Sequence, residues 1–109
     1  MLCSSGAAIN AYEGWGAYGA TKAALNHLAL TLATEEPDIT TVSIRPGVVD
    51  TDMQKSIREV HHEKMSEKDR AKFAELKSSG GLLKPEQPGN VMARLVLSAP
   101  RDLNGTFLR

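Results

Sequence analysis

The fold is decided by one helical stretch, WGAYGATKAALNHLALTLATE, at residues 15–35. Leucines recur in it at spacings of three and four, the period of one helix face, at Leu25, Leu28 and Leu32. Alanines fill positions between them, so the helix is apolar around most of its circumference. We therefore expect one side to pack on a sheet and the other on a second helix. Pro37 ends the run, because proline cannot supply the next helical hydrogen-bond donor.

Short strands are expected on both sides of this helix. The β-branched run TTVSIR at residues 40–45 predicts a strand, which the Pro46-Gly47 pair stops. Upstream, residues 1–4 are typical of the end of a buried strand that has lost its beginning, and residues 5–14 are small and polar enough to form a loop. A fragment, a gene-model error and a genuine short form are all compatible with such a start.

The second half of the chain predicts a flap followed by a helix and a strand. Residues 52–79 alternate charges of both signs with few apolar residues, so they bury little area and we expect a mobile flap of one or two short helices. Ser66 and Asp69 resemble a capping box that opens one of these helices. Pro88 is well placed as the first residue of the next helix, and the Asn-Gly pair at residues 104–105 signals a turn before a last strand.

The order of elements is therefore strand, helix, strand, flap, helix, strand, which is an α/β pattern. Strands that alternate with helices imply right-handed crossovers and a parallel sheet. Three strands make only about half of a doubly wound sheet, so we expect one edge strand with unpaired backbone groups.

Composition limits the classes of function. Hydrophobic residues make up 41% and charged residues 24%, which predicts a globular chain and not a disordered one. The net charge of zero argues against broad binding to nucleic acid or to an anionic membrane. No apolar run approaches the ~20 residues of a membrane span. Cys3 is the only cysteine, which suits a reducing cytoplasm, and we expect it to be a small buried residue on a strand.

The residues that carry chemistry are Ser5, Tyr18 and Lys22. Tyr18 and Lys22 are four apart on the predicted helix, so both side chains leave the same face. A tyrosine phenol is a poor acid–base group at neutral pH, but a nearby ammonium favours the phenolate. Ser5 adds a hydroxyl that can hydrogen-bond a substrate carbonyl oxygen. A Tyr-x-x-x-Lys pair alone usually marks a half-buried tyrosine beside a surface lysine, so the surrounding motifs have to decide.

Four motifs occur together and span nearly the whole chain: Ser4-Ser5-Gly6, YGATKAAL at 18–25, RPGVVDT at 45–51, and Asn104-Gly105. In their order and spacing the chain resembles the short-chain dehydrogenase/reductase family. The wider stretches WGAY and VDTDMQ are most similar to its fungal benzil reductase and sepiapterin-reductase-like branch. The resemblance implies the C-terminal part of a Rossmann-like, doubly wound parallel sheet, with its last three strands and their crossover helices.

The resemblance also implies roles for individual residues. Ser5 orients and polarises the carbonyl, and it is preferred over Ser4 because the 13-residue interval to Tyr18 matches the family. Tyr18 donates the proton in reduction, while Lys22 favours its phenolate and hydrogen-bonds the nicotinamide ribose. The other residues implied to contact the cofactor come directly after the second strand. Pro46 and Gly47 lie beside the nicotinamide ring, and Val49 and Thr51 contact its carboxamide. Read without the family, Pro46-Gly47 is simply a strand-ending turn.

Several family features have no match in this chain. There is no Gly-rich phosphate loop after a strand, no residue that selects NADP over NAD, and no tetrad asparagine. The resemblance implies NADP, with NAD as an alternative, as the cofactor of the lineage. Because the phosphate loop is missing, we expect little turnover by this polypeptide alone. A non-catalytic interaction module is the competing hypothesis, because the family's tyrosine helix lies in a dimer interface and the 15–35 helix has the small apolar surface that this needs.

Two further features remain open or are set aside. Tyr12 and Trp15 either line the substrate pocket or pack within the loop. His61-His62-Glu63 resembles metal-ligand material, but adjacent histidines point about 100° apart on a helix and no second cluster completes a site, so we expect no metal.

Overall fold

In a computed structural model that describes residues 1–109, the three strands form one parallel sheet in the order β1-β2-β3. They are β1 (Leu2–Cys3), β2 (Ser43–Ile44) and β3 (Phe107–Leu108). The register pairs Leu2 with Ser43 and Ser43 with Phe107. The α/β class and the parallel pairing are confirmed. The strands are shorter than the 1–4 and 40–45 runs, because only two residues of each run pair in the sheet.

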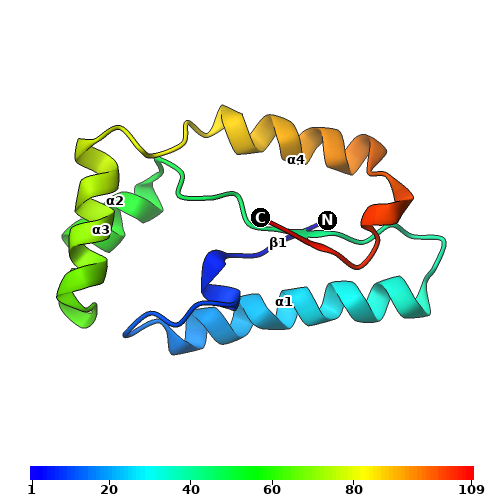
Figure 1. The fold of residues 1–109 in the computed structure, drawn as a ribbon, viewed down its shortest axis with the longest axis horizontal. Coiled ribbons are helices and arrows are strands. Elements are labelled where there is room, and N and C mark those ends of the chain that lie inside the picture. Colours follow the sequence, from blue (N-terminus) through cyan, green and yellow to red (C-terminus); the bar gives the residue numbers. More distant parts are fainter.

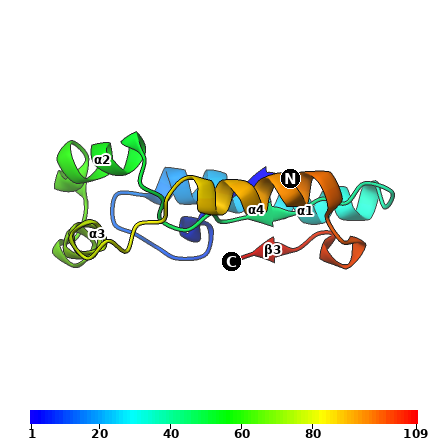
Figure 2. The same ribbon diagram turned by 90° about the horizontal axis from the view of Figure 1, so that it is seen from above.

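The chain also has four α-helices: α1 (Gly16–Glu35), α2 (Asp52–Glu59), α3 (Glu67–Ser78) and α4 (Glu86–Ser98). Figure 1 shows the strands running between α1 and α4, and Figure 2, turned by 90°, shows the same two helices on opposite faces of the sheet. The arrangement is the doubly wound one expected. Helices α2 and α3 lie together beyond one end of the sheet and belong to the segment 52–79, which is called the flap below.

The sheet-side core is small. Val42, Ser43 and Ala29 are almost fully buried, where β2 meets the inner side of α1. A second cluster lies inside the flap and consists of Ile57, Met65 and Phe73. Trp15 and Val48, which lie on the sheet side, pack against this flap cluster, so these two side chains join the flap to the rest of the molecule.

Three predictions about packing are wrong. The outer side of α1 does not pack on a second helix, and Leu28 is 44% exposed there. Cys3 is exposed because β1 is an edge strand that pairs only with β2. Helix α4 begins at Glu86 after Pro85, so Pro88 is its third residue and not its first. Both prolines still lie in the first turn, where a missing N–H costs nothing.

Two turn predictions are confirmed. The Ser66 hydroxyl accepts a hydrogen bond from the Asp69 amide at 3.2 Å and starts α3. Gly105 has φ +76°, and beside it the Asn104 side chain accepts from the Thr41 amide at 2.7 Å, which ties the entry to β3 to the strand next to it. None of the helices combines the length and the apolar character that crossing a bilayer requires.

Candidate active site

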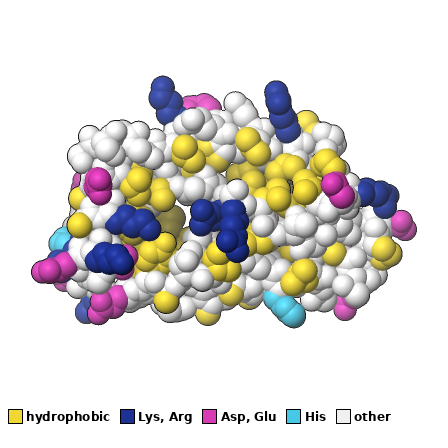
Figure 3. Space-filling view, viewed as in Figure 1, with side chains coloured by type: hydrophobic (Ala, Val, Ile, Leu, Met, Phe, Trp, Pro, Cys, Tyr) yellow, Lys and Arg dark blue, Asp and Glu magenta, His cyan; other side chains and the backbone are white.

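The candidate site is a cleft of about 530 Å³ at the carboxyl ends of β1 and β2. Open parallel sheets bind ligands at this edge. All seven residues predicted from the sequence to form the site line this cleft. One follows β1, two belong to α1 and four follow β2: Ser5, Tyr18, Lys22, Pro46, Gly47, Val49 and Thr51. Figure 3 shows the molecule hollowed between the flap and the strands, with hydrophobic side chains inside the hollow and Lys and Arg side chains around it.

Tyr18 and Lys22 lie together on the cleft side of α1. The Lys22 ammonium is 5.6 Å from the centroid of the Tyr18 ring. It also donates a hydrogen bond to the Cys3 carbonyl oxygen at 2.9 Å. This bond to the end of β1 fixes the ammonium beside the phenol, so the helix spacing and the sheet edge position the pair together.

Ser4 and Ser5 have different surroundings. Ser4 is 3% exposed, and its hydroxyl donates to the Lys22 carbonyl oxygen at 3.2 Å, which joins β1 to α1. Ser5 lines the cleft, and its hydroxyl oxygen accepts from the Ala7 amide at 3.2 Å. An oxygen that accepts this bond still has its proton to donate. The surroundings favour Ser5 as the residue that meets a substrate.

A glycine lets the serine loop lie directly on the tyrosine helix. The loop forms a short 3₁₀ helix, Gly6–Ala8, that packs on α1. At Gly19 a Cβ atom would lie 2.8 Å from the Ala7 carbonyl oxygen, closer than real Cβ contacts come. The residue after Tyr18 is therefore the point of closest approach between the two segments that carry the serine and the tyrosine.

The segment after β2 forms the opposite wall of the cleft. Gly47 turns it with φ +84°, and a Cβ there would lie 2.8 Å from the Leu83 side chain. Val49 and Leu83 then form a parallel bridge, in which the Leu83 amide donates to the Val48 carbonyl and the Asp50 amide donates to the Leu83 carbonyl. Neither bond uses the amide of Val49, which in a parallel bridge points away from Leu83.

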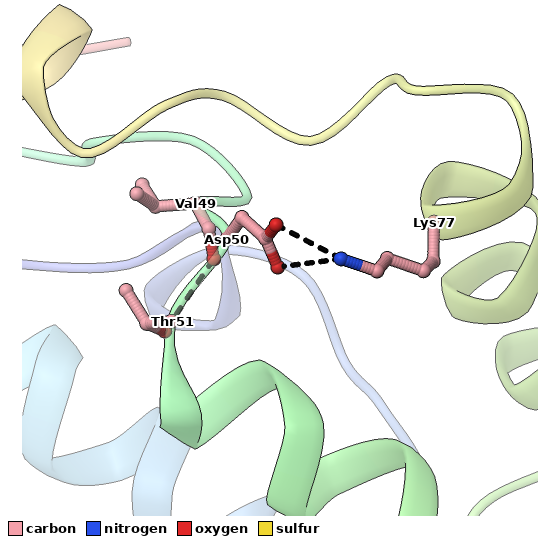
Figure 4. Close-up of polar contacts among 4 residues, drawn as sticks. All are labelled: Val49, Asp50, Thr51 and Lys77. Atoms are coloured by element: carbon pink, nitrogen blue, oxygen red, sulfur yellow. Dashed lines mark hydrogen bonds and ion pairs between the residues drawn. The ribbon is translucent and has the colours of Figure 1, made fainter.

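An ion pair ties the same segment to the flap (Figure 4). The Lys77 ammonium donates to both carboxylate oxygens of Asp50, at 3.1 and 2.9 Å. The Thr51 hydroxyl donates to the Val49 carbonyl oxygen at 3.4 Å. In this segment the Asp50 amide thus bonds to Leu83, the Asp50 carboxylate bonds to the flap, and the Thr51 hydroxyl bonds back to Val49.

Aromatic rings form the third wall. Trp15 stacks on Phe73 with ring centroids 5.8 Å apart and an interplanar angle of 11°. It meets the Tyr18 ring edge-on at 5.5 Å and the Tyr12 ring at 5.6 Å. The sequence left open whether Tyr12 and Trp15 line the pocket or pack within the loop. In the structure they line the cleft and also pack on each other.

Lys72 and Phe73 are among the cleft residues that sequence reasoning missed. Both belong to α3, and nothing in the sequence of that helix says which element it packs against. The histidines set aside above belong to the flap, where His62 begins a short 3₁₀ helix, His62–Lys64. Nowhere in the structure do three His, Cys, Asp or Glu side chains gather closely enough to hold a metal ion.

Comparison with known proteins agrees with this geometry. The sequence profile of the family described as "short chain dehydrogenase" matches residues 2–62. A benzil reductase ((S)-benzoin forming) of Saccharomyces cerevisiae is 49% identical over 113 residues, which cover 100% of this chain and 43% of the relative. A sepiapterin reductase of Mus musculus is 42% identical over 80 residues, which cover 73% of this chain and 30% of the relative.

Solved structures give the same result. The crystal structure of the KRED1-Pglu enzyme superposes with a TM-score of 0.93 at 50% identity, covering 96% of this chain and 44% of that one. The chain thus spans less than half the length of the relatives it matches. Because the family profile covers more than half of these 109 residues and the tyrosine, lysine and serine motifs lie within it, the chain belongs to the short-chain dehydrogenase family of oxidoreductases.

Proposed function

We propose that this chain carries the catalytic part of a cytoplasmic carbonyl reductase that uses NADPH, with NADH as the alternative, to reduce a ketone or diketone. One observation carries the proposal: Ser5, Tyr18 and Lys22 line a single cleft, with the ammonium of Lys22 held 5.6 Å from the ring of Tyr18. The names of the relatives, benzil reductase and sepiapterin reductase, support a carbonyl substrate.

In this mechanism the substrate carbonyl oxygen lies between Ser5 and Tyr18. The Ser5 hydroxyl donates a hydrogen bond to that oxygen and polarises the carbonyl. As negative charge develops on the oxygen, the Tyr18 phenol donates its proton to it, which gives the alcohol and leaves a phenolate. The Lys22 ammonium stabilises this phenolate, and Cys3 keeps the ammonium in position through its carbonyl oxygen.

The groups present fit the nicotinamide end of a dinucleotide. The amide N–H of Val49 takes part in no backbone bond and can donate to a carboxamide oxygen. Pro46 and Gly47 offer an apolar surface for the ring, and Lys22 can reach a ribose hydroxyl from the far side of the cleft. When bound, the cofactor supplies a hydride to the carbonyl carbon.

The pyrophosphate end has no counterpart among these residues. No Gly-rich loop follows a strand in this chain, so the groups that would bind most of a dinucleotide are absent from it. We therefore expect the purified 109-residue chain to show negligible reductase activity with NADPH. Turnover comparable with that of a full-length relative would contradict this expectation.

A chimera tests the chemistry separately from this expectation. Residues 1–109 would replace the matching segment of the yeast benzil reductase, and NADPH oxidation would be followed with benzil as substrate. Because Tyr18 donates the proton, Tyr18→Phe should lower kcat by at least ~100-fold. Lys68→Gln changes an exposed side chain outside the cleft and should leave kcat within about threefold. Equal losses in the two variants, or none in Tyr18→Phe, would refute the assignment.

A dimerisation module is the second candidate. Apolar side chains of α1 are uncovered on both flanks of the buried Ala29, with Leu28 44% and Leu30 55% exposed. Small residues around Leu28 would allow another helix to come close on that flank. On this alternative the chain pairs with a full-length relative or with itself, and Tyr18→Phe would leave that association intact. Analytical ultracentrifugation of the wild type and of Leu28→Glu distinguishes the two, since only an interface on this face is broken by the added charge.

A further inference from the structure

We propose that the flap end of the cleft selects substrates that carry an anionic group, and that Lys72 is the specificity-determining residue. The proposal rests on carbonyl reduction at Ser5 and Tyr18, and it adds a substrate class: a ketone with an apolar, ring-sized body and a carboxylate or similar anion several atoms away from the carbonyl.

The charge of the cleft is one-sided. Its lining contains three cationic side chains, Lys22, Arg45 and Lys72, and no Asp or Glu. The two ion pairs of the structure, Lys77 with Asp50 and Arg101 with Asp38, involve none of the three. The positive charge in the cleft is therefore not neutralised by the chain itself, so an anionic ligand is attracted to it.

Lys72 is the one of the three cations that belongs to the flap. Lys22 is bonded to the Cys3 carbonyl beside Tyr18, and the Arg45 guanidinium lies against Gly6, 3.2 Å from where a Cβ would stand. Lys72 lies instead over the ring of Tyr12, with its ammonium 5.4 Å from the ring centroid. Its ammonium therefore lies beside the aromatic wall of the cleft.

The aromatic wall sets the distance between the two recognised groups. From Lys72 the contacts run to Tyr12, then to Trp15, and from Trp15 to the Tyr18 ring. Two rings therefore separate the ammonium from the catalytic phenol. A substrate that reaches both groups lays its apolar body along Tyr12 and Trp15, with its anion at the Lys72 end of this wall.

The test uses the 109-residue chain without cofactor, because Trp15 is its only tryptophan and lies in this wall. The probes are 5-oxo-5-phenylpentanoate and its neutral amide, which have nearly the same shape but differ in charge, and binding is read from quenching of Trp15 fluorescence. At low ionic strength the carboxylate should bind about fivefold more tightly than the amide, as expected for one partly exposed cation. The preference should vanish at about 0.5 M salt.

Variants assign the preference to Lys72. Lys72→Gln should bind both probes equally, while Lys72→Arg should restore the preference. Lys68→Gln, one turn earlier on the same helix and outside the cleft, should leave it unchanged. Equal binding of the two probes by the wild type, a preference that survives in Lys72→Gln, or no binding of either probe would overturn the proposal. Loss of proton transfer in the Tyr18→Phe chimera is measured separately, so failure of the mechanism and failure of this specificity remain distinguishable.

Discussion

The two sides of the cleft are held in different ways. On the sheet side, Lys22 and Ser4 are fixed by hydrogen bonds to carbonyl oxygens of each other's segments, and the backbones approach closely at Gly19. On the flap side, the ring of Phe73 rests on Trp15, and one exposed ion pair joins Lys77 to Asp50. Tyr18 and Lys22 are thus positioned by contacts with the backbone and the aromatic wall by side-chain packing, so the wall can change without moving Tyr18.

Removal of the packed ring should separate the two sides most clearly. Phe73 is 5% exposed, and its replacement by alanine should cost about 3–4 kcal/mol of local stability in the flap. Hydrogen exchange should accelerate for amides of α2 and α3 and stay unchanged for α1. Lys68→Ala is the matched control on the same helix. Equal acceleration in α1 would mean that the flap and the sheet unfold together, against the separation described above.

A Cβ at Gly19 should act on the sheet side alone. In Gly19→Ala the new atom meets the Ala7 carbonyl oxygen, which belongs to the backbone and cannot turn aside, so we expect a loss of about 1–3 kcal/mol in stability. Gly16→Ala places the same methyl group in the same helix with nothing within 4 Å, and should be neutral or stabilising by up to ~1 kcal/mol. Thermal unfolding of both variants measures the difference. A Gly19→Ala variant as stable as Gly16→Ala would show that the close approach does not hold the serine loop.

The ion pair at the base of the flap should have the smallest effect. Both side chains are about half exposed, so Asp50→Asn and Lys77→Gln should each cost well under ~1 kcal/mol. A double-mutant cycle, read from chemical denaturation, should give a coupling energy of a few tenths of a kcal/mol that decreases with added salt. A coupling above ~2 kcal/mol would make this pair, and not the Trp15–Phe73 stack, the main attachment of the flap.

The same contrast explains what could be predicted from the sequence. Local spacing was enough for the sheet side: Tyr18 and Lys22 share a helix face whatever surrounds them, and the Pro46-Gly47 pair ends its strand by its own stereochemistry. The start of α4 was misplaced because Pro85 and Pro88 are both compatible with a first helical turn.

The flap side could not be predicted in this way. Phe73 was one of a few apolar residues in a charged segment, and its partner Trp15 lies 58 positions away (73 minus 15) on another element. The pairing depends on how α3 packs in three dimensions, and neither helix period nor charge pattern specifies that. Lys72 enters the cleft only because its neighbour Phe73 is fixed there.

The central claim of the proposed mechanism is that Ser5 and Tyr18 act on one carbonyl oxygen as a unit, with Lys22 supporting the tyrosine. The most direct measurement compares kcat for Ser5→Ala, Tyr18→Phe and the double variant in the chimera with benzil. Groups that act as a unit show strongly non-additive losses. We predict that the double variant is no slower than Tyr18→Phe within about threefold. Losses that multiply, so that the double variant falls by the product of the two single effects, would contradict the claim.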